Sequence, residues 1–201
     1  MRVTPAGLPE LGGCVVLVPV KAFSQAKARL APMLDGTRRA ELARTMAATV
    51  VAAAAPLPVA VVCDDPEVAD WAASVGAIVL PEPGRGLNGA VAAGADRLQE
   101  AGATEIIVAH GDLPFAHDLP RLAGFHGVTL VPDRAEDGTN VICIPAGSRF
   151  RFSYGPGSFT RHRAETARLG LALRIVREPA LALDVDVPGD LPAVPGGWLA
   201  L

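Results

Sequence analysis

Three cationic side chains stand close together directly after the first strongly apolar run of the chain. Lys21, Lys27 and Arg29 fall within nine residues, and residues 14–20 before them are almost entirely apolar. Ligands of open α/β sheets bind beyond the carboxyl ends of the strands, so cations at this position predict an anionic ligand. Lysine and arginine neutralise phosphate oxygens, arginine with a planar fork of donors. We interpret the segment as a phosphate site, and a solvent-exposed basic loop is the alternative.

Aspartates follow two further strand-like runs. Asp112 lies after the run 105–109, between a glycine and a Leu-Pro pair, where the backbone has to leave the sheet. A carboxylate there can bind Mg²⁺, which takes oxygen ligands from one or two carboxylates and from substrate phosphates. Near the C-terminus, alternation puts Asp184 and Asp186 on the same side of an extended strand, so one of them could be a second ligand. The alternatives are a turn aspartate at 112 and acids that solvate an edge strand.

Two loops carry glycine and hydroxyl side chains. Residues 132–140 contain Gly138 and Thr139, and residues 152–162 lead into a helix-like segment. In the second loop, Gly155 lets the backbone approach a ligand and Ser158 can cap the helix, whose first N–H groups suit a phosphate or carboxylate. Together the loops are candidates for binding a carboxylate through hydroxyl and backbone donors, and a plain capped loop is the alternative.

Residues 84–89 match the dinucleotide fingerprint GxGxxG. A Rossmann dehydrogenase carries this fingerprint in the first strand–helix turn, whereas here it follows the third strand-like run and the first turn carries lysines. We therefore interpret Gly86, Leu87 and Asn88 as residues that border the sugar or base of a nucleotide. The sequence has no HExxH, GxSxG or P-loop motif, which argues against hydrolases and P-loop ATPases. His110 and His162 are expected to be satisfied or solvated histidines.

Short apolar runs alternate with helix-like segments and form the elements that must position these side chains. The strand-like runs cover residues 14–20, 59–63, 77–80, 105–109, 128–131, 140–144 and 172–176. The helix-like segments cover residues 37–54, 66–74, 88–101 and 158–169. This alternation predicts an α/β fold, a single domain with a mainly parallel sheet flanked by helices. Thr37 is the expected cap of the first helix.

The composition restricts the class of ligand and the compartment. With 201 residues, half of them hydrophobic, the chain can form one core, and we expect one domain over residues 1–201 with residues 1–13 as a flexible N-terminal segment. A net charge of −3 argues against nucleic acid and membrane surfaces as partners. No secretory signal or membrane-spanning run is visible, and Cys14, Cys63 and Cys143 are expected as free thiols, so we expect a cytoplasmic protein.

Taken in order, these motifs resemble those of a known family. The telling pieces are Val18-Pro-Val-Lys21, Ala26-Lys27-Ala-Arg29-Leu, Gly86-Leu-Asn88, His110-Gly-Asp112-Leu-Pro, residues 132–140 and residues 152–159. From residue 15 to about residue 193 the chain resembles the guanylyltransferases that make the phospholactyl or enolpyruvyl dinucleotide precursor of coenzyme F420. The resemblance implies a molybdopterin-type nucleotidyltransferase fold, that is, a Rossmann-like sheet of the nucleotide-diphospho-sugar transferase type.

The resemblance also implies roles for individual residues. The cations that it places at the triphosphate are Lys21, Lys27 and Arg29, which form the catalytic set with Asp112. It implies Mg²⁺ as the cofactor, held by Asp112 and Asp186. The residues that it places at the acid substrate are Thr139, Gly155 and Ser158. The chain departs from the wider nucleotidyltransferase pattern in having Lys-Ala-Phe-Ser-Gln in place of a glycine-rich loop after the first strand. Side chains, more than backbone amides, are therefore expected to bind the phosphates.

The implied reaction is transfer of GMP from GTP to phosphoenolpyruvate or 2-phospho-L-lactate with release of pyrophosphate, in coenzyme F420 biosynthesis. Phosphoenolpyruvate is the expected acceptor on resemblance alone, and 3-phosphoglycerate stays open, as does a homodimer. The alternatives are a related nucleotidyltransferase with another acceptor or base, and a nucleotide-binding regulator without turnover. Binding alone does not need acids, cations and a hydroxyl loop together, which disfavours the regulator.

Overall fold

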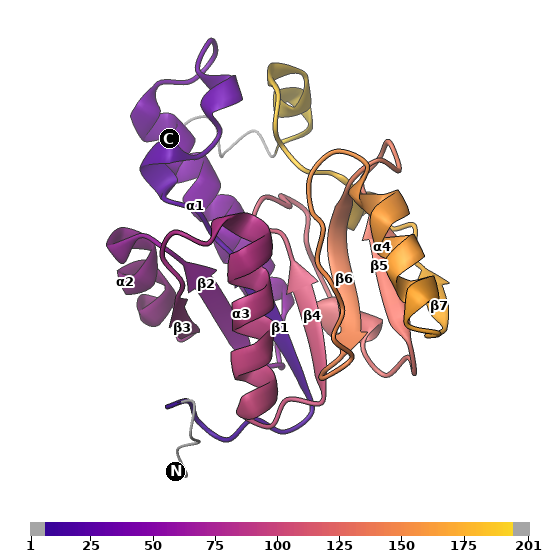
Figure 1. Cartoon of the computed structure of the whole chain (residues 1–201). Helices are drawn as coiled ribbons and strands as arrows, with labels where there is room; N and C mark the ends of the chain where they lie inside the picture. Colours follow the sequence, from indigo (N-terminus) through magenta and orange to yellow (C-terminus); the bar gives the residue numbers. More distant parts are fainter. Residues whose placement is uncertain (1–6, 195–201) are drawn as a thin grey trace.

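A seven-stranded sheet forms the centre of the computed structural model, which describes residues 7–194 (Figure 1). Its strands are β1 (Cys14–Pro19), β2 (Val59–Cys63), β3 (Ile78–Pro81), β4 (Glu105–Ala109), β5 (Val128–Pro132), β6 (Thr139–Pro145) and β7 (Leu173–Ile175). Each of them falls on one of the seven apolar runs, with ends shifted by at most a few residues.

The strand order is β3-β2-β1-β4-β6-β5-β7. All neighbours are parallel except β6, which runs antiparallel to both β4 and β5. The short connection from β5 to β6 permits an antiparallel pairing but no crossover, which needs a dozen residues or more. The predicted mainly parallel sheet is confirmed, and the carboxyl ends of β1 to β4 meet at one edge.

The helices are α1 (Gly36–Ala53), α2 (Pro66–Ser74), α3 (Gly86–Glu100), α4 (Ser158–Arg168) and α5 (Pro179–Ala182). Short 3-10 helices are η1 (Phe23–Gln25), η2 (Ala28–Leu30), η3 (Leu119–Leu122) and η4 (Pro188–Ala193). The predicted cap at Thr37 is wrong: Asp35 caps α1, and its side chain accepts a hydrogen bond from the Arg38 N–H at 2.9 Å. Aspartate is among the best N-cap residues, and here the helix begins one residue earlier than predicted.

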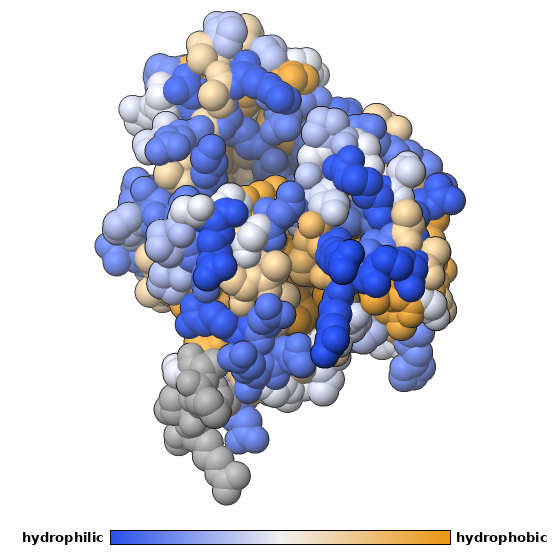
Figure 2. All heavy atoms as spheres, in the orientation of Figure 1, coloured by the Kyte–Doolittle hydropathy of each residue, from blue (hydrophilic) through white to orange (hydrophobic). Residues whose placement is uncertain are grey.

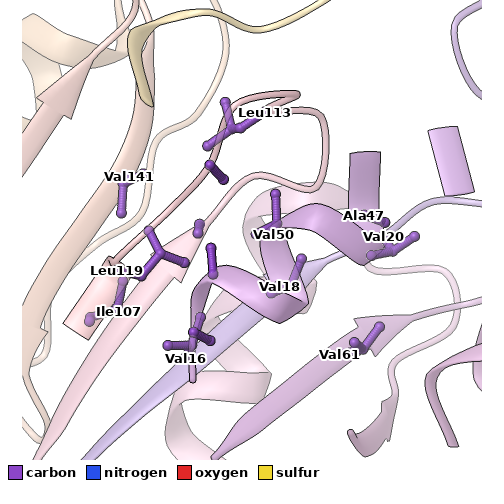
Figure 3. Close-up of a cluster of buried hydrophobic side chains, with 14 of the residues drawn as sticks. Val16, Val18, Val20, Ala47, Val50, Val61, Ile107, Leu113, Leu119 and Val141 are labelled. Carbon is purple, nitrogen blue, oxygen red and sulfur yellow. The ribbon is translucent and has the colours of Figure 1, made fainter. Parts of the chain in front are cut away.

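The two faces of the sheet carry separate hydrophobic clusters. Val16 and Val18 of β1 pack with Val50 of α1 on one face, as Figure 3 shows. Leu17, between them in the sequence, joins the cluster under α3 and α4 on the other face, as the two-residue period of a strand requires. Gly94 of α3 lies over Leu17, where a Cβ would come within 3.2 Å of a leucine methyl, so glycine permits this close packing.

Part of the expected flexible segment, residues 1–6, lies outside the described residues. In its described part, Leu8 and Leu11 are buried in the cluster under α3, and the Leu11 N–H donates to the Ala101 carbonyl at 2.7 Å. Hydrophilic residues cover most of the face shown in Figure 2, with hydrophobic residues in smaller patches between them. Within residues 7–194, none of the helices has both the length and the apolar character needed to cross a bilayer.

Candidate active site

A cavity of about 480 Å³ opens at the edge where β1 to β4 end. Each of these strands sends a residue to its wall just after its last position: Lys21, Asp64, Glu82 and Asp112 follow β1, β2, β3 and β4. Leu87, in the first turn of α3, lines it as well. The cavity thus lies where open α/β sheets bind ligands.

Lys27 reaches the acidic side of this cavity from the loop between η1 and η2. Its backbone is left-handed, with φ of 53°, and its side chain is only 8% exposed. The ammonium donates to Asp112 Oδ2 at 2.7 Å and to Asp186 Oδ1 at 3.0 Å. Burial alone lowers the pKa of Lys27, but the two carboxylates outweigh it and raise the pKa above its ordinary value.

Three carboxylates converge on the same point. One oxygen from each of Asp112, Asp184 and Asp186 lies within 4.8 Å of the others. The second oxygen of Asp112, Oδ1, is buried and has no hydrogen-bond partner within residues 7–194. An oxygen-only donor set with a buried, unpartnered carboxylate oxygen fits a hard divalent cation such as Mg²⁺.

The carboxylates differ in their surroundings. Burial raises the pKa of Asp112, but the charge and the hydrogen bond of Lys27 outweigh it and hold that pKa below its ordinary value. Burial, together with the charge of Asp112, raises the pKa of Asp184 to about 6. The Asp186 side chain is 49% exposed and also lies 3.9 Å from Arg29 Nη1. Arg29 itself is 75% exposed and is not among the residues that line the cavity.

The segment that carries Asp184 and Asp186 is extended but is not a strand of the sheet, contrary to the sequence prediction. It runs past the end of β4, where the Val185 N–H donates to the Asp112 carbonyl at 3.4 Å. The alternation still holds: Val185 is buried and both aspartates face Asp112. A polar anchor follows, since Asp190 Oδ2 accepts from the N–H groups of Asp186 and Val187 at 2.9 and 3.0 Å.

Of the residues expected at the nucleotide, Gly86 and Leu87 line the cavity. Asn88 is not among its lining residues. Its Oδ1 accepts a hydrogen bond from the Tyr154 N–H at 2.6 Å, and its Nδ2 donates to the Tyr154 carbonyl at 3.5 Å. Asn88 therefore connects α3 to the loop before α4.

The residues expected at the acid substrate lie apart from the cavity wall. Thr139 is 2% exposed and its Oγ1 hydrogen-bonds His162 Nδ1 at 3.1 Å. Ser158 is 1% exposed and is the first residue of α4, so it is not the cap; that position is held by Gly157, at φ of 72°. Gly155, also at positive φ, is exposed.

The start of α4 is already occupied by groups of the chain itself. The Gly157 N–H donates to Asp137 Oδ2 at 3.0 Å, and the Phe159 N–H donates to the Asp137 carbonyl at 3.0 Å. The Ser158 N–H donates to the Gly155 carbonyl. The expectation of free N–H groups at this helix start is therefore wrong for these three amides.

Comparison with known proteins identifies the chain. A family model described as guanylyl transferase, CofC like, matches residues 14–194. The chain belongs to this family. A phosphoenolpyruvate guanylyltransferase of Sphaerobacter thermophilus is 36% identical over 191 residues, which cover 90% of this chain and 92% of the relative. A protein of the same name from Conexibacter woesei is 38% identical over 192 residues, which cover 89% of this chain and 85% of the relative.

Solved structures support the fold of this guanylyl transferase. A nucleotidyl transferase from Methanothermobacter aligns with a TM-score of 0.65 at 15% identity, covering 94% of this chain and 98% of the other. The 4-diphosphocytidyl-2C-methyl-D-erythritol synthase from Anaerococcus prevotii aligns with a TM-score of 0.62 at 8% identity, covering 94% and 99%. At these identities the likeness shows the fold alone, and it confirms the expected nucleotidyltransferase type of sheet.

Two acids in the pocket of this guanylyl transferase were missed by the sequence analysis. Asp64 and Glu82 lie one and two residues after strand-like runs, so the rule that singled out Lys21 would have found them. Glu82 already pairs with Arg85 Nε at 2.7 Å and with Arg97 Nη1 at 3.5 Å. Asp64 is exposed, and its side chain has no hydrogen bond or ion pair within residues 7–194.

The two histidines considered from the sequence, His110 and His162, have different environments. His162 is buried and satisfied, because its Nε2 accepts from the Ser153 N–H at 2.9 Å and its Nδ1 bonds Thr139. His110 lines the cavity, and its Nε2 is buried with no partner among the described residues. Burial lowers the pKa of His110, and the opposing charge of Asp112 does not reverse this. A neutral imidazole therefore stands beside the acids.

Proposed function

We propose that this chain transfers GMP from GTP to phosphoenolpyruvate and releases pyrophosphate. The observation that carries the proposal is the meeting of Lys21 and Lys27 with Asp112 and Asp186 in one cavity at the carboxyl ends of parallel strands, with Asp184 next to the two acids. Cations for phosphates and oxygen ligands for a divalent metal are what nucleotidyl transfer requires. The acceptor is inferred from relatives, since family members 36–38% identical carry the name phosphoenolpyruvate guanylyltransferase.

Asp64 supports guanine as the base. It follows the last residue of β2 and lines the cavity, as do Gly86 and Leu87. Guanine presents two adjacent N–H donors on its pairing edge, and a free carboxylate with two acceptor oxygens matches them. Glu82 is less suited, since two arginines already engage it.

Asp112 and Asp186 would hold Mg²⁺, with Asp184 beside them, because their oxygens converge. The metal, when bound, supplies positive charge at the phosphate oxygens on which negative charge develops. The raised pKa of Asp184 makes this carboxyl partly protonated near pH 6, so the full charge of the acidic cluster is present only above that pH.

The reaction needs no strong general base in the protein. The phosphate of the acceptor is largely dianionic at neutral pH, and one of its oxygens attacks the α-phosphorus of GTP. A new P–O bond forms there, and the bond from the α-phosphorus to the oxygen that bridges to the β-phosphate breaks, so pyrophosphate leaves with the electron pair. Lys21 has no ion pair within residues 7–194, so its ammonium is available to the triphosphate. Arg29, which lies 3.9 Å from Asp186, can neutralise the leaving pyrophosphate.

We also propose how the chain binds the carboxylate of the acid substrate. Thr139 and Ser158 are buried behind the loop that holds Tyr154, and Gly155 is the exposed member of the expected trio. A direct contact with the acid therefore involves the Gly155 backbone first. Thr139 and Ser158 would support that loop from behind, Thr139 through its bond to His162.

The test is to incubate purified protein and Mg²⁺ with each nucleoside triphosphate and each candidate acid, and to measure pyrophosphate release. GTP with phosphoenolpyruvate is expected to give the highest turnover, and ethyl phosphate, which lacks the carboxylate, very little. Preference for CTP or for a sugar phosphate would instead support a related nucleotidyltransferase. Nucleotide binding without pyrophosphate release from any pair would support a regulator.

A further inference from the structure

Lys27 makes contacts that a phosphate-binding lysine does not need. Its ammonium lies between two of the three carboxylates, 2.7 Å from Asp112 Oδ2 and 3.0 Å from Asp186 Oδ1. Its side chain is 8% exposed, whereas Arg29, the other cation near Asp186, is 75% exposed and 3.9 Å away. The charge of the acidic cluster is therefore balanced mainly by Lys27, from inside the protein.

A divalent cation would bind the same carboxylates as the Lys27 ammonium. Mg²⁺ binds carboxylate oxygens at about 2.0–2.1 Å, so an ion on the oxygens that Lys27 engages would lie within about 5 Å of the ammonium. An ion on the unpartnered Asp112 Oδ1 would bind the same carboxylate as the ammonium and share its negative charge with it. At that distance, in a poorly solvated setting, the two positive charges repel strongly. Lys27 and the metal therefore compete for Asp112 and Asp186.

The lysine has an alternative partner in the same cavity. Lys27 is itself among the residues that line it, as are Lys21, Gly86 and Leu87. A triphosphate in the cavity would bring several anionic oxygens within reach of a flexible side chain with four methylene groups. When a nucleotide arrives with its metal, the metal takes the carboxylates and the ammonium takes a phosphate.

We propose that Lys27 acts as an internal competitor of the metal and so couples metal binding to nucleotide binding. The chain then binds free divalent cation weakly and the metal–nucleotide complex tightly. The coupling is reciprocal, because each ligand raises the affinity for the other by the same factor. This inference rests on the proposed function only for its nucleotide half; the competition between Lys27 and metal stands on the carboxylate contacts.

The experiment titrates Mn²⁺, as a spectroscopic substitute for Mg²⁺, into the full chain without nucleotide and follows it by electron paramagnetic resonance. Lys27→Met is expected to bind Mn²⁺ about tenfold or more tightly than wild type, within the usual range of coupling energies. Lys21→Met is the matched control: it removes a cation from the same cavity that makes no ion pair with the carboxylates, so a change of less than about twofold is expected.

A second arm titrates the Mg²⁺ complex of a GTP analogue with a methylene group between the α- and β-phosphorus. Lys27→Met is expected to bind it more weakly than wild type, so the variant changes the two affinities in opposite directions. A purely structural role would weaken both. Equal or weaker Mn²⁺ binding by Lys27→Met overturns the proposal.

A third variant covers loss of folding. If circular dichroism shows that Lys27→Met is unfolded, Lys27→Gln keeps a donor between the carboxylates without the charge and carries the same expectation. The first arm contains no nucleotide, so tighter Mn²⁺ binding holds even if no GTP turnover is found. If Lys27→Met binds Mn²⁺ more tightly but the wild-type chain releases no pyrophosphate from any substrate pair, the proposed function is rejected. The competition between Lys27 and the metal is then still supported.

Discussion

Asp112 has two oxygens with different environments, and this asymmetry decides what the residue can do. Oδ2 pairs with Lys27, while Oδ1 is buried with no partner in the described part of the chain. A buried carboxylate oxygen without a partner is costly unless a ligand uses it. At the scale of single residues, the site is therefore prepared for a cation.

Asp112→Asn is expected to fold and to lose more than about 100-fold in kcat/KM, because the amide keeps the shape but removes a charged metal ligand. The measurement is pyrophosphate release in saturating Mg²⁺, with circular dichroism as the check on folding. Asp118→Asn is the matched control, since Asp118 is exposed, caps no helix with its side chain and has a positive φ that asparagine tolerates. Near wild-type turnover of Asp112→Asn would sink the metal assignment.

Asp184 gives a prediction about pH. Its folded pKa of about 6 lies above the ordinary value of 3.8, so folding takes up a proton between these pH values. The free energy of unfolding therefore falls as pH rises from about 4 to about 6 and is unaffected by this group above that window. The effect is on the order of 1 kcal/mol after a discount for partial exposure.

Urea denaturation of Asp184→Asn and wild type at pH 4.5 and pH 7.5 checks this. Asparagine removes the disfavoured charge, so the variant should gain stability relative to wild type at pH 7.5 and gain less at pH 4.5. The same difference at both values would mean that Asp184 titrates normally in the folded chain.

At the scale of elements, one hydrophobic cluster brings the second and third carboxylates to the first. It joins Leu30 of η2 and Met46 of α1 with Val185, Leu191 and Val194 of the C-terminal segment. In the sequence, Lys27 and Arg29 come just before Leu30 of this cluster, and Asp184 and Asp186 stand on either side of Val185. Apolar packing thus sets the distance between the basic loop and the acids.

Asp190→Ala tests whether the anchor of this segment positions the acids. Asp190 is mostly buried, accepts two backbone N–H groups and pairs with Arg134 at 2.7 Å. Its removal is expected to cost about 1–3 kcal/mol of stability and to lower the affinity for Mn²⁺, although Asp190 is not in the acidic cluster. Arg134→Ala, the control, removes only an ion pair whose arginine is 56% exposed and should cost about 0–1 kcal/mol. Equal effects of the two variants on metal affinity would refute the anchor role.

At the scale of the whole molecule, the sheet supplies a rigid edge and the loops supply the chemistry. Both faces of the central strands are covered by helices, so the strand ends that carry Lys21, Asp64 and Asp112 are fixed relative to one another. The chain that closes the site comes from its last described part, residues 183–194, and packs on α1 and η2. Ligands that bridge the strand ends and this segment should stabilise the entire domain.

Mg²⁺ and the methylene analogue of GTP are expected to raise the melting temperature more together than the sum of their separate effects. Binding to the folded state stabilises by about 2.7 kcal/mol at 100 times Kd, and positive coupling lowers the effective Kd of both ligands. Differential scanning fluorimetry with each ligand alone and with both decides this. Strict additivity would show that metal and nucleotide bind independently.

The sequence by itself determined the strands and the main helices, and it determined the site residues that directly follow strands. Seven apolar runs became the seven strands, because hydrophobic periodicity is a local property of the sequence. Lys21 and Asp112 line the cavity because each comes just after such a run, and the general rule for open α/β sheets places ligands there. The same rule would have found Asp64 and Glu82.

Only the tertiary structure decided which distant groups meet. Three contacts join residues that lie 20 to 159 positions apart in the sequence. They are the hydrogen bond between Asn88 and Tyr154, the hydrogen bonds of Asp137 to the start of α4, and the ion pairs of Lys27 with Asp112 and Asp186. No local pattern encodes such partners, since a hydrogen bond or ion pair depends on distances that packing sets. For Lys27 the sequence and the structure indicate different partners. The sequence motif predicts that its ammonium binds a phosphate, whereas in the structure the ammonium pairs with the carboxylates of Asp112 and Asp186.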